Sequence, residues 1–418
     1  MALNEVKEVA TQNFEDATLD EFIGDIKEAI ELGEYNVPYL GFGKSGIGKT
    51  ESIRNAICDP LGIGLIEMRL GSYSAQDLTG FPVPLEDDKV NNNRPMVYFS
   101  DVSKFPHEGR DPERGILLLD EFPAAEQDVR TAALQLTDVS RSIGDYHLPP
   151  KWLVVILGNG PDDGGAYLGC EYTLLNRCMC YRVHTSFDIW KNWALRNNVN
   201  DAVLAFIENN GADDILHNMN PDSEYYESDA SPRMWYALSQ KLNAREALNN
   251  SVIDPRKAGR LAGAAVGHRI APKFEAFYAF KKDMIPVADI MSGKAEKTDV
   301  KNRRIESLYI LINSISSTVN SILITNHEYL ENREPLPKEE HDKLNNLFKF
   351  VIKLGRERQI DLAIGAFSNM QKASSGKFTK LISLPTFSAD YPEYLKFALE
   401  HRDMLITNSD IERYMSSN

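Results

Sequence analysis

The stretch VPYLGFGKSGIGKTE, residues 37–51, decides the fold. A short apolar run at 37–40 enters a glycine-rich turn, and residues 48–57 then have a helical pattern. Gly43 to Thr50 match G-x-x-x-x-G-K-[ST] at every fixed position. A strand that enters a glycine-rich loop and leaves as a helix is the context in which this pattern binds phosphate. The alternative, a glycine-rich turn with a solvated lysine, does not account for that context.

The chemistry of this loop predicts an ATP site. Glycines let consecutive backbone N–H groups converge on phosphate oxygens, and the helix that follows adds the positive end of its dipole. Lys49 is placed to neutralise the β- and γ-phosphates, and the Thr50 hydroxyl to ligate Mg²⁺. The residues expected to bind the nucleotide are Gly43, Lys44, Ser45, Gly46, Ile47, Gly48, Lys49, Thr50, Glu51 and Asp120.

Two acidic residues, Asp120 and Glu121, directly follow the apolar run 116–119. Hydrolysis needs a metal ligand opposite the phosphate loop and a group that orients the attacking water. We expect Asp120 to complete the Mg²⁺ site and Glu121 to polarise the water, because ligands collect at the carboxyl edge of a parallel sheet. The competing interpretation is an ordinary strand that ends in a solvated acidic pair.

Another apolar run, 152–157, leads to Asn159. An amide at the end of a neighbouring strand can bridge the γ-phosphate and the attacking water, so Asn159 is a candidate catalytic residue. Its alternative role is a turn residue, since Asn159-Gly160-Pro161 is typical turn chemistry.

The order of the elements predicts an α/β fold. A capped helix is expected over 18–33, and mostly apolar strands over 37–40, 65–70, 116–119 and 152–157. Strands of this kind, separated by helices such as 48–57 and 124–136, indicate a parallel sheet that is covered on both faces. A hairpin tip is expected at residues 91–93. Beyond residue 186 the pattern predicts helices, among them 187–209 and 232–244.

Composition narrows the function classes. The 418 residues carry a formal net charge of -15, which counts against a general nucleic-acid or anionic-membrane binder. Cys170, Cys178 and Cys180 follow a C-x7-C-x-C spacing, which is unlike a structural zinc site and favours reduced thiols over metal binding. The chain opens without a secretory signal pattern, and polar residues interrupt the apolar stretch 308–324. We therefore expect a cytoplasmic protein that does not span a membrane.

Taken together, the ordered motifs resemble the AAA+ ATPases, most closely their MoxR-like branch. The resemblance covers roughly residues 20–245 and rests on five segments: GKSGIGKTE (43–51), DLTG (77–80), LLLDEFP (117–123), residues 141–149 and VVILGNGPDD (154–163). It implies a parallel five-stranded core over residues 1–186, a helical lid over 187–250 and an all-α region over 251–418. It also implies a ring, typically a hexamer, with ATP at the interfaces between subunits.

The same resemblance assigns roles to arginines. Arg177 falls where the family carries the arginine finger, which reaches into the site of the neighbouring subunit, although Arg182 is an alternative. Arg233 matches the lid arginine that contacts the γ-phosphate in its own chain. Ser231 and Pro232 before it suit a helix start. The other interpretation of Arg233 is a surface ion-pair residue.

The resemblance also implies a pore-facing insert at 80–100 and a hairpin near the pore at 141–148. Asp138-Val139-Ser140-Arg141-Ser142 spells the metal-adhesion pattern of von Willebrand A domains, but it follows an amphipathic stretch, which favours a helix end that enters a hairpin. MoxR-like ATPases often act with a separate A-domain protein. We expect remodelling or assembly of a protein partner; the alternatives are a nucleic-acid motor, with a basic patch at 294–304, and a nucleotide-gated scaffold.

Overall fold

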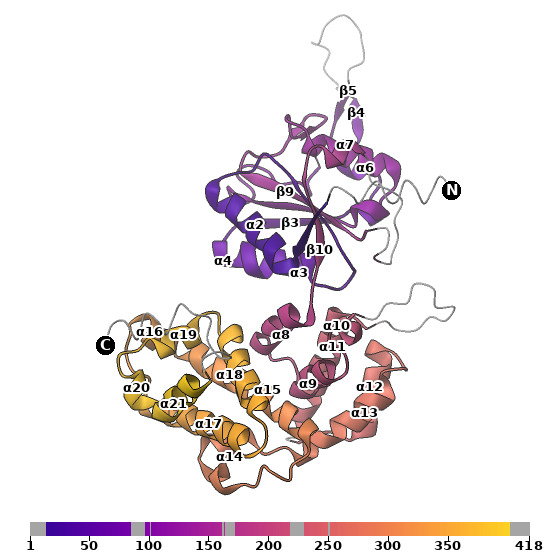
Figure 1. The fold of residues 1–418 in the computed structure, drawn as a ribbon. Helices are drawn as coiled ribbons and strands as arrows, with labels where there is room; N and C mark the ends of the chain where they lie inside the picture. The colour runs from indigo at the N-terminus through magenta and orange to yellow at the C-terminus, as the bar shows by residue number, and fades with distance from the viewer. Residues whose placement is uncertain are drawn as a thin grey trace, which may run out of the picture. The chain divides into compact units, whose positions relative to one another are not determined.

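The computed structural model describes residues 14–84, 97–100, 102–160, 163, 172–217, 230–249 and 251–401. It divides into two compact units, residues 1–186 and 187–418. The first unit holds the sheet, and the described part of the second unit is built from helices (Figure 1).

A parallel sheet forms the centre of the first unit, as predicted. Among the described residues it has six strands in the order β1-β10-β2-β9-β6-β3, one more than the five that the family resemblance implies. The extra strand β1 pairs with β10 at the edge, and its sequence EDAT buries only Ala17, so no apolar run marks it. The strands are β1 (Glu15–Thr18), β2 (Tyr39–Phe42), β3 (Gly64–Arg69), β6 (Gly115–Asp120), β9 (Trp152–Gly158) and β10 (Met179–His184).

Helices cover both faces of this sheet (Figure 1). Ile116 and Leu118 of β6 pack with α2 (Leu19–Leu32) and α3 (Lys49–Ile53), whereas Leu117 and Leu119 face α6 (Gln127–Leu134). Side chains alternate along a strand, so one uninterrupted apolar run serves two separate hydrophobic layers. The shorter helical elements of this unit are η1 (Arg54–Cys58), α4 (Asp59–Leu61), η2 (Leu70–Ser72), α5 (Gln76–Thr79), η3 (Phe122–Ala124), η4 (Gln135–Thr137) and α7 (Tyr172–Leu175).

The opening helix has the predicted ends. The Thr18 side chain accepts from the Glu21 N–H while Glu21 returns a bond to the Thr18 N–H, and Gly33 closes α2 with φ 79°. The helix after the phosphate loop differs from the prediction because it continues as a π-helical turn, η1. The helix predicted from residue 124 begins at Gln127, since the chain first makes the turn η3.

Two hairpins extend from the first unit. β4 (Pro82–Pro84) pairs with β5 (Val97–Phe99), and β7 (Ser142–Ile143) pairs with β8 (Tyr146–His147). The predicted hairpin tip at residues 91–93 lies outside the described residues. Asp138 follows the turn η4 and leads into β7, so the D-x-S-x-S stretch does enter a hairpin.

In the second unit, the prediction of one long helix over 187–209 is wrong in one respect, because the segment forms two helices. Asn198 has φ 52°, and the Asn200 side chain caps a new helix by accepting from the Ala202 N–H. The helices of this unit are α8 (Phe187–Arg196), α9 (Asp201–Asn209), α10 (Asp213–Leu216), α11 (Pro232–Asn249), α12 (Pro255–Val266), α13 (Ala271–Tyr278), η5 (Ala279–Asp283), α14 (Val287–Met291), η6 (Lys294–Lys297), α15 (Ile305–Thr325), α16 (His327–Glu331), α17 (Lys338–Glu357), α18 (Ile360–Ala373), α19 (Lys377–Ile382), α20 (Phe387–Asp390) and α21 (Pro392–Glu400).

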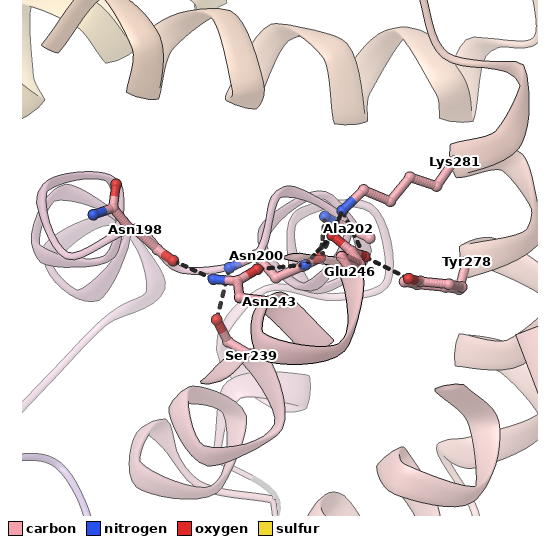
Figure 2. A network of polar contacts seen from close by, with 8 residues as sticks. All are labelled: Asn198, Asn200, Ala202, Ser239, Asn243, Glu246, Tyr278 and Lys281. Atoms are coloured by element: carbon pink, nitrogen blue, oxygen red, sulfur yellow. Dashed lines mark hydrogen bonds and ion pairs between the residues drawn. The ribbon is translucent and has the colours of Figure 1, made fainter. Parts of the chain in front are cut away.

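A buried polar network ties helices on both sides of residue 250 together (Figure 2). Lys281 Nζ lies 2.7 Å and 2.9 Å from the two carboxylate oxygens of Glu246, and Tyr278 donates its hydroxyl to the same carboxylate. The Asn200 amide bonds both Asn243 and Glu246, at 2.7 Å and 3.2 Å. Trp235 of α11 and Phe274 of α13 share one hydrophobic cluster around the network. The division into a lid and a C-terminal region at residue 250 therefore stays a prediction.

One described helix, α15, is long and apolar enough to cross a membrane by length and composition. It is a core helix of the second unit, since 61% of its most apolar window is buried and Ile315, Val319 and Leu323 are covered by neighbouring helices.

Candidate functional site

The predicted phosphate loop leaves the centre of the sheet between β10 and β9. Its first residue, Gly43, donates its N–H to Gly158 O at 3.1 Å. A Cβ on Gly43 would lie 2.0 Å from Val183 O, so the close approach of β10 admits only glycine here. Gly46 and Gly48 have φ 79° and 99°, which glycine adopts without steric cost. The glycines of the motif thus let the loop turn sharply into α3.

Lys49 is the first residue of α3, and only 8% of it is exposed. Its ammonium donates to Gly43 O at 2.5 Å and to Lys44 O at 3.1 Å. The loop therefore wraps around a fixed positive charge. These two carbonyl contacts hold the ammonium inside the loop, where Coulomb attraction to a bound anion is strong.

Thr50 and Asp120, which are 70 positions apart in the chain, meet at the carboxyl edge of the sheet. The Thr50 hydroxyl donates to Asp120 Oδ2 at 2.8 Å. Mg²⁺ takes oxygen ligands at about 2.0–2.1 Å in octahedral geometry, so adjacent ligand oxygens lie about 2.9 Å apart. The Thr50 and Asp120 oxygens thus have the chemistry and the spacing of a neighbouring ligand pair, and the residues fit the predicted Mg²⁺ site.

Glu121 has a left-handed backbone conformation, with φ 57° and ψ 29°. Residues other than glycine adopt it at a cost, and such conformations concentrate at functional sites. Two bonds hold the turn, because Glu121 donates its N–H to Asp120 Oδ1 at 2.8 Å and accepts at its carbonyl from Ala124. Its exposed side chain passes over Gly71, where a Cβ would lie 3.0 Å from Glu121 Oε2. The carboxylate is accessible at the predicted edge of the sheet.

Asn159 follows β9, the strand that separates the phosphate-loop strand from β6. Gly158 before it pairs in register with Phe42, the last residue of β2, so Asn159 lies at the same edge as Gly43. A Cβ on Gly158 would lie 2.2 Å from Pro123 Cδ. The turn after Glu121 therefore packs closely against the strand end that carries Asn159.

Arg69 lies at this edge too, and no sequence motif marked it. It is the last residue of β3 and stands in register with Asp120. Its Nε donates to Glu67 Oε1 at 2.9 Å. The pKa of Arg69 is raised, first by this hydrogen bond and charge and further by the Glu121 and Asp120 carboxylates nearby. A signal was present in the sequence, since Arg69 is the last residue of a strand, as Asp120 is, and Asn159 directly follows one.

The candidate arginine fingers lie at different edges. Arg177 precedes β10 by two residues, and the first residue of β10, Met179, donates its N–H to Pro38 O at 2.9 Å. Arg177 is therefore at the amino edge, separated from its own phosphate loop by the length of β2, about 13 Å for four residues. Arg182 is in register with Phe42, beside its own loop, and lies 3.8 Å from Asp16.

The remaining predicted contacts lie elsewhere. Arg233 is exposed in the first turn of α11, in the second unit, and the Ser231 hydroxyl accepts from the Met234 N–H at 3.4 Å, as expected of a cap. Glu51 is exposed and accepts from Asn55 at 3.0 Å along α3. The nucleotide contacts predicted for Arg233 and Glu51 stay predictions.

Two of the described cysteines, Cys58 and Cys180, are free thiols. Burial raises the pKa of both Cys58 and Cys180 to about 11. These two thiols are therefore protonated at neutral pH. Cys170 lies outside the described residues.

No family model matches this chain, and no curated protein matches it. Among solved structures, a Cytophaga hutchinsonii protein described as a candidate ATPase is 16% identical over 60% of this chain and 85% of that one, with a TM-score of 0.28. Closed Hsp104 with ATPγS and FITC-casein is 18% identical over 56% and 46% of the two chains, with a TM-score of 0.34.

NtrX from Brucella abortus in complex with ATP is also similar, at 12% identity over 94% of this chain and 72% of that one, with a TM-score of 0.29. These identities and TM-scores are low, so the functional proposal rests on the residues of this chain. Its fold and carboxyl edge define an α/β protein with a phosphate-loop motif whose lysine, threonine and paired acids meet at one site.

Proposed function

We propose that this chain hydrolyses ATP as an AAA+ ATPase, most similar to the MoxR-like branch. The observation that carries the proposal is the 2.8 Å contact between Thr50 and Asp120, because it joins the phosphate loop to the acidic strand end. A loop that only bound an anion would need no carboxylate beside its threonine. A magnesium-nucleotide site requires oxygen ligands from both segments, placed next to each other.

Each residue at the edge then has a chemical role. The loop N–H groups and Lys49 bind the β- and γ-phosphates. Thr50 and Asp120 would hold Mg²⁺, which when bound would neutralise charge on the phosphates. Glu121 orients a water so that its oxygen forms a bond to the γ-phosphorus while the bond to the β–γ bridging oxygen breaks, which yields ADP and phosphate. Asn159 hydrogen-bonds the same water or the γ-phosphate.

Arg177 completes the site of a neighbouring copy. It lies at the amino edge of the sheet, whereas the acids and the phosphate loop lie at the carboxyl edge. A unit with the phosphate loop at one edge and the finger at the opposite edge favours head-to-tail association of copies. Such an association closes into a ring when the rotation between copies permits. We propose a homo-oligomeric ring, most simply a hexamer, with Arg177 rather than Arg182 as the finger. Arg233 would act on ATP in its own chain.

The substrate of such a ring would be a protein. The hairpin β4–β5 presents two exposed aromatic side chains near its base, with Phe81 61% and Phe99 47% exposed, which suits contact with a polypeptide. In the basic stretch at 294–304, Arg303 donates to Asp283 O at 2.6 Å and Arg304 lies over the Phe280 ring, contacts that belong to folding. We propose that the partner is a protein in the cytoplasm, such as one with a von Willebrand A domain.

Substitution of the loop lysine tests the site directly. Lys49→Ala should abolish ATP binding, measured by calorimetry on the full chain, because the buried ammonium is the fixed cation of the loop. Lys27→Ala is the control, since it removes an equal charge from a partly exposed position of α2, where Lys27 forms an ion pair with Glu31. Normal affinity in Lys49→Ala would contradict the ATP site.

A further inference from the structure

The candidate finger Arg177 already has a partner in its own chain. Its Nη2 lies 3.0 Å from Asp138 Oδ1, and 35% of the Arg177 side chain and 44% of the Asp138 side chain are exposed. The two residues lie 39 positions apart in the sequence but in the same unit. The contact therefore depends on the tertiary fold, which places the guanidinium beside Asp138, and not on local sequence.

Asp138 belongs to a turn that is held firmly in place. Its carbonyl accepts from the Arg141 N–H at 3.0 Å, and Arg141 has φ 48° with only 8% of the residue exposed. The Arg141 guanidinium donates to Pro150 O at 3.1 Å and also to Trp152 O. Trp152 is the first residue of β9, so the turn is fastened to the amino edge of the sheet. The Asp138 carboxylate thus occupies a defined position at that edge.

Arg177 reaches that carboxylate from an independently anchored segment. Its N–H donates to Leu174 O at 3.0 Å, and Leu174 is fully buried in the same hydrophobic cluster as Leu136, two residues before Asp138. The backbone on both sides is thereby fixed, and the long Arg177 side chain is the flexible part. Exposed ion pairs contribute little to stability. This pair can therefore favour one direction of the guanidinium and still break when the guanidinium binds a triphosphate.

We propose that Asp138 is a positioning residue, which aims the Arg177 guanidinium outward from the amino edge into the ATP site of a neighbouring copy. The proposal rests on the proposed function, because it requires Arg177 to act across an interface. A guanidinium held in one orientation before assembly loses less conformational freedom when it meets the γ-phosphate. Asp138 itself does not touch ATP.

Asp138→Asn tests this role because it keeps the shape of the side chain and removes its charge. We expect kcat for ATP hydrolysis to fall by about twofold to fivefold, because an exposed ion pair biases the orientation of a side chain only modestly, with little change in KM. Asp138→Glu should recover part of the loss. Glu108→Gln, which removes another exposed carboxylate of the same unit, should have no effect. An unchanged or raised kcat in Asp138→Asn would overturn the proposal, and a rise would mean that Asp138 sequesters the finger.

Two further variants separate this inference from the function beneath it. In an Arg177→Ala background, Asp138→Asn should cause no additional loss, because nothing is left to position; a further loss would overturn the proposal. If Arg177→Ala slows hydrolysis while Asp138→Asn does not, the positioning role alone fails. If Arg177→Ala keeps full turnover, the proposal of an ATP site shared between copies is contradicted as well.

Discussion

At the scale of single residues, Glu121 combines an exposed carboxylate with a left-handed backbone, at φ 57°. Its N–H is bonded to the Asp120 carboxylate, the same group that meets Thr50. One turn therefore sets the positions of the metal ligand and of the proposed water-orienting acid together. Since the conformation costs free energy in a non-glycine residue, the surrounding contacts must hold it.

Glu121→Gln should retain ATP affinity but lower turnover by about 10²- to 10⁴-fold, because an amide cannot accept the proton of the attacking water. Phosphate release and ATP binding, measured on the same preparation, check both halves of this expectation. Glu126→Gln is the control, as it removes an exposed carboxylate five residues further along without touching the turn. Equal turnover in Glu121→Gln and Glu126→Gln would remove Glu121 from the chemistry.

Much of the site at this scale could be predicted from the sequence. The positions of Lys49, Thr50 and Asp120 were predictable, because they depend on a loop pattern and on an apolar strand that ends in polar residues. The backbone of Glu121 and the position of Arg69 were not, since both depend on which strands are neighbours in the sheet. The contact between Arg177 and Asp138 was not predictable either, because nothing local links the two segments.

At the scale of elements, close approach between strands decides where glycine is required. Gly43→Ala should destabilise the first unit by roughly 1–3 kcal/mol, because its Cβ would lie 2.0 Å from the backbone oxygen of Val183. Gly24→Ala, in the exposed middle of α2 with no atom within 4 Å of the added Cβ, should stabilise by about 0.5–1 kcal/mol. Urea unfolding measures both changes, and destabilisation of equal size at the two positions would contradict this packing account.

The buried network of the second unit gives a second test at this scale (Figure 2). Lys281→Met should destabilise by about 3–5 kcal/mol, since it leaves the Glu246 carboxylate largely buried without its cation. Adding Glu246→Leu should recover part of this loss. Lys349→Met breaks an ion pair of 3.8 Å with Glu393 whose partners are about half exposed, and should have little effect in the same urea titration. A loss as large in Lys349→Met as in Lys281→Met would contradict the role of burial.

Helices and strands were predictable where the sequence has a repeating hydrophobic pattern. The prediction failed where tertiary contacts determine the secondary structure. The strands β3, β6 and β9 were predicted from apolar runs, and α2 from its cap and periodicity. β1 was missed because an edge strand with one buried residue has no hydrophobic pattern. The break between α8 and α9 was missed because Asn198 and Asn200 interrupt an otherwise continuous periodicity.

At the scale of the whole molecule, the first unit carries complementary parts at opposite edges of one sheet. Lys49, Thr50 and Asp120 meet at the carboxyl edge, while Arg177 lies at the amino edge beside Asp138. A single copy cannot bring its own Arg177 to its own loop along the length of β2. The account therefore requires that each ATP site is completed by another copy. From the sequence alone, a site shared between copies is predicted only through the family resemblance, because the order of the strands is a property of the folded sheet.

The most direct measurement mixes two variants of the full chain that we expect to be inactive. In the proposed function, Arg177→Ala keeps the ATP site but loses the finger, and Glu121→Gln keeps the finger but loses the carboxylate that orients water. If Arg177 acts on a neighbouring copy, mixing the two should restore ATP hydrolysis above the sum of the separate samples, whereas Glu121→Gln that also carries Arg177→Ala should restore nothing. Mixtures that never exceed that sum, or an Arg177→Ala protein that hydrolyses ATP at the full rate alone, would contradict the shared site.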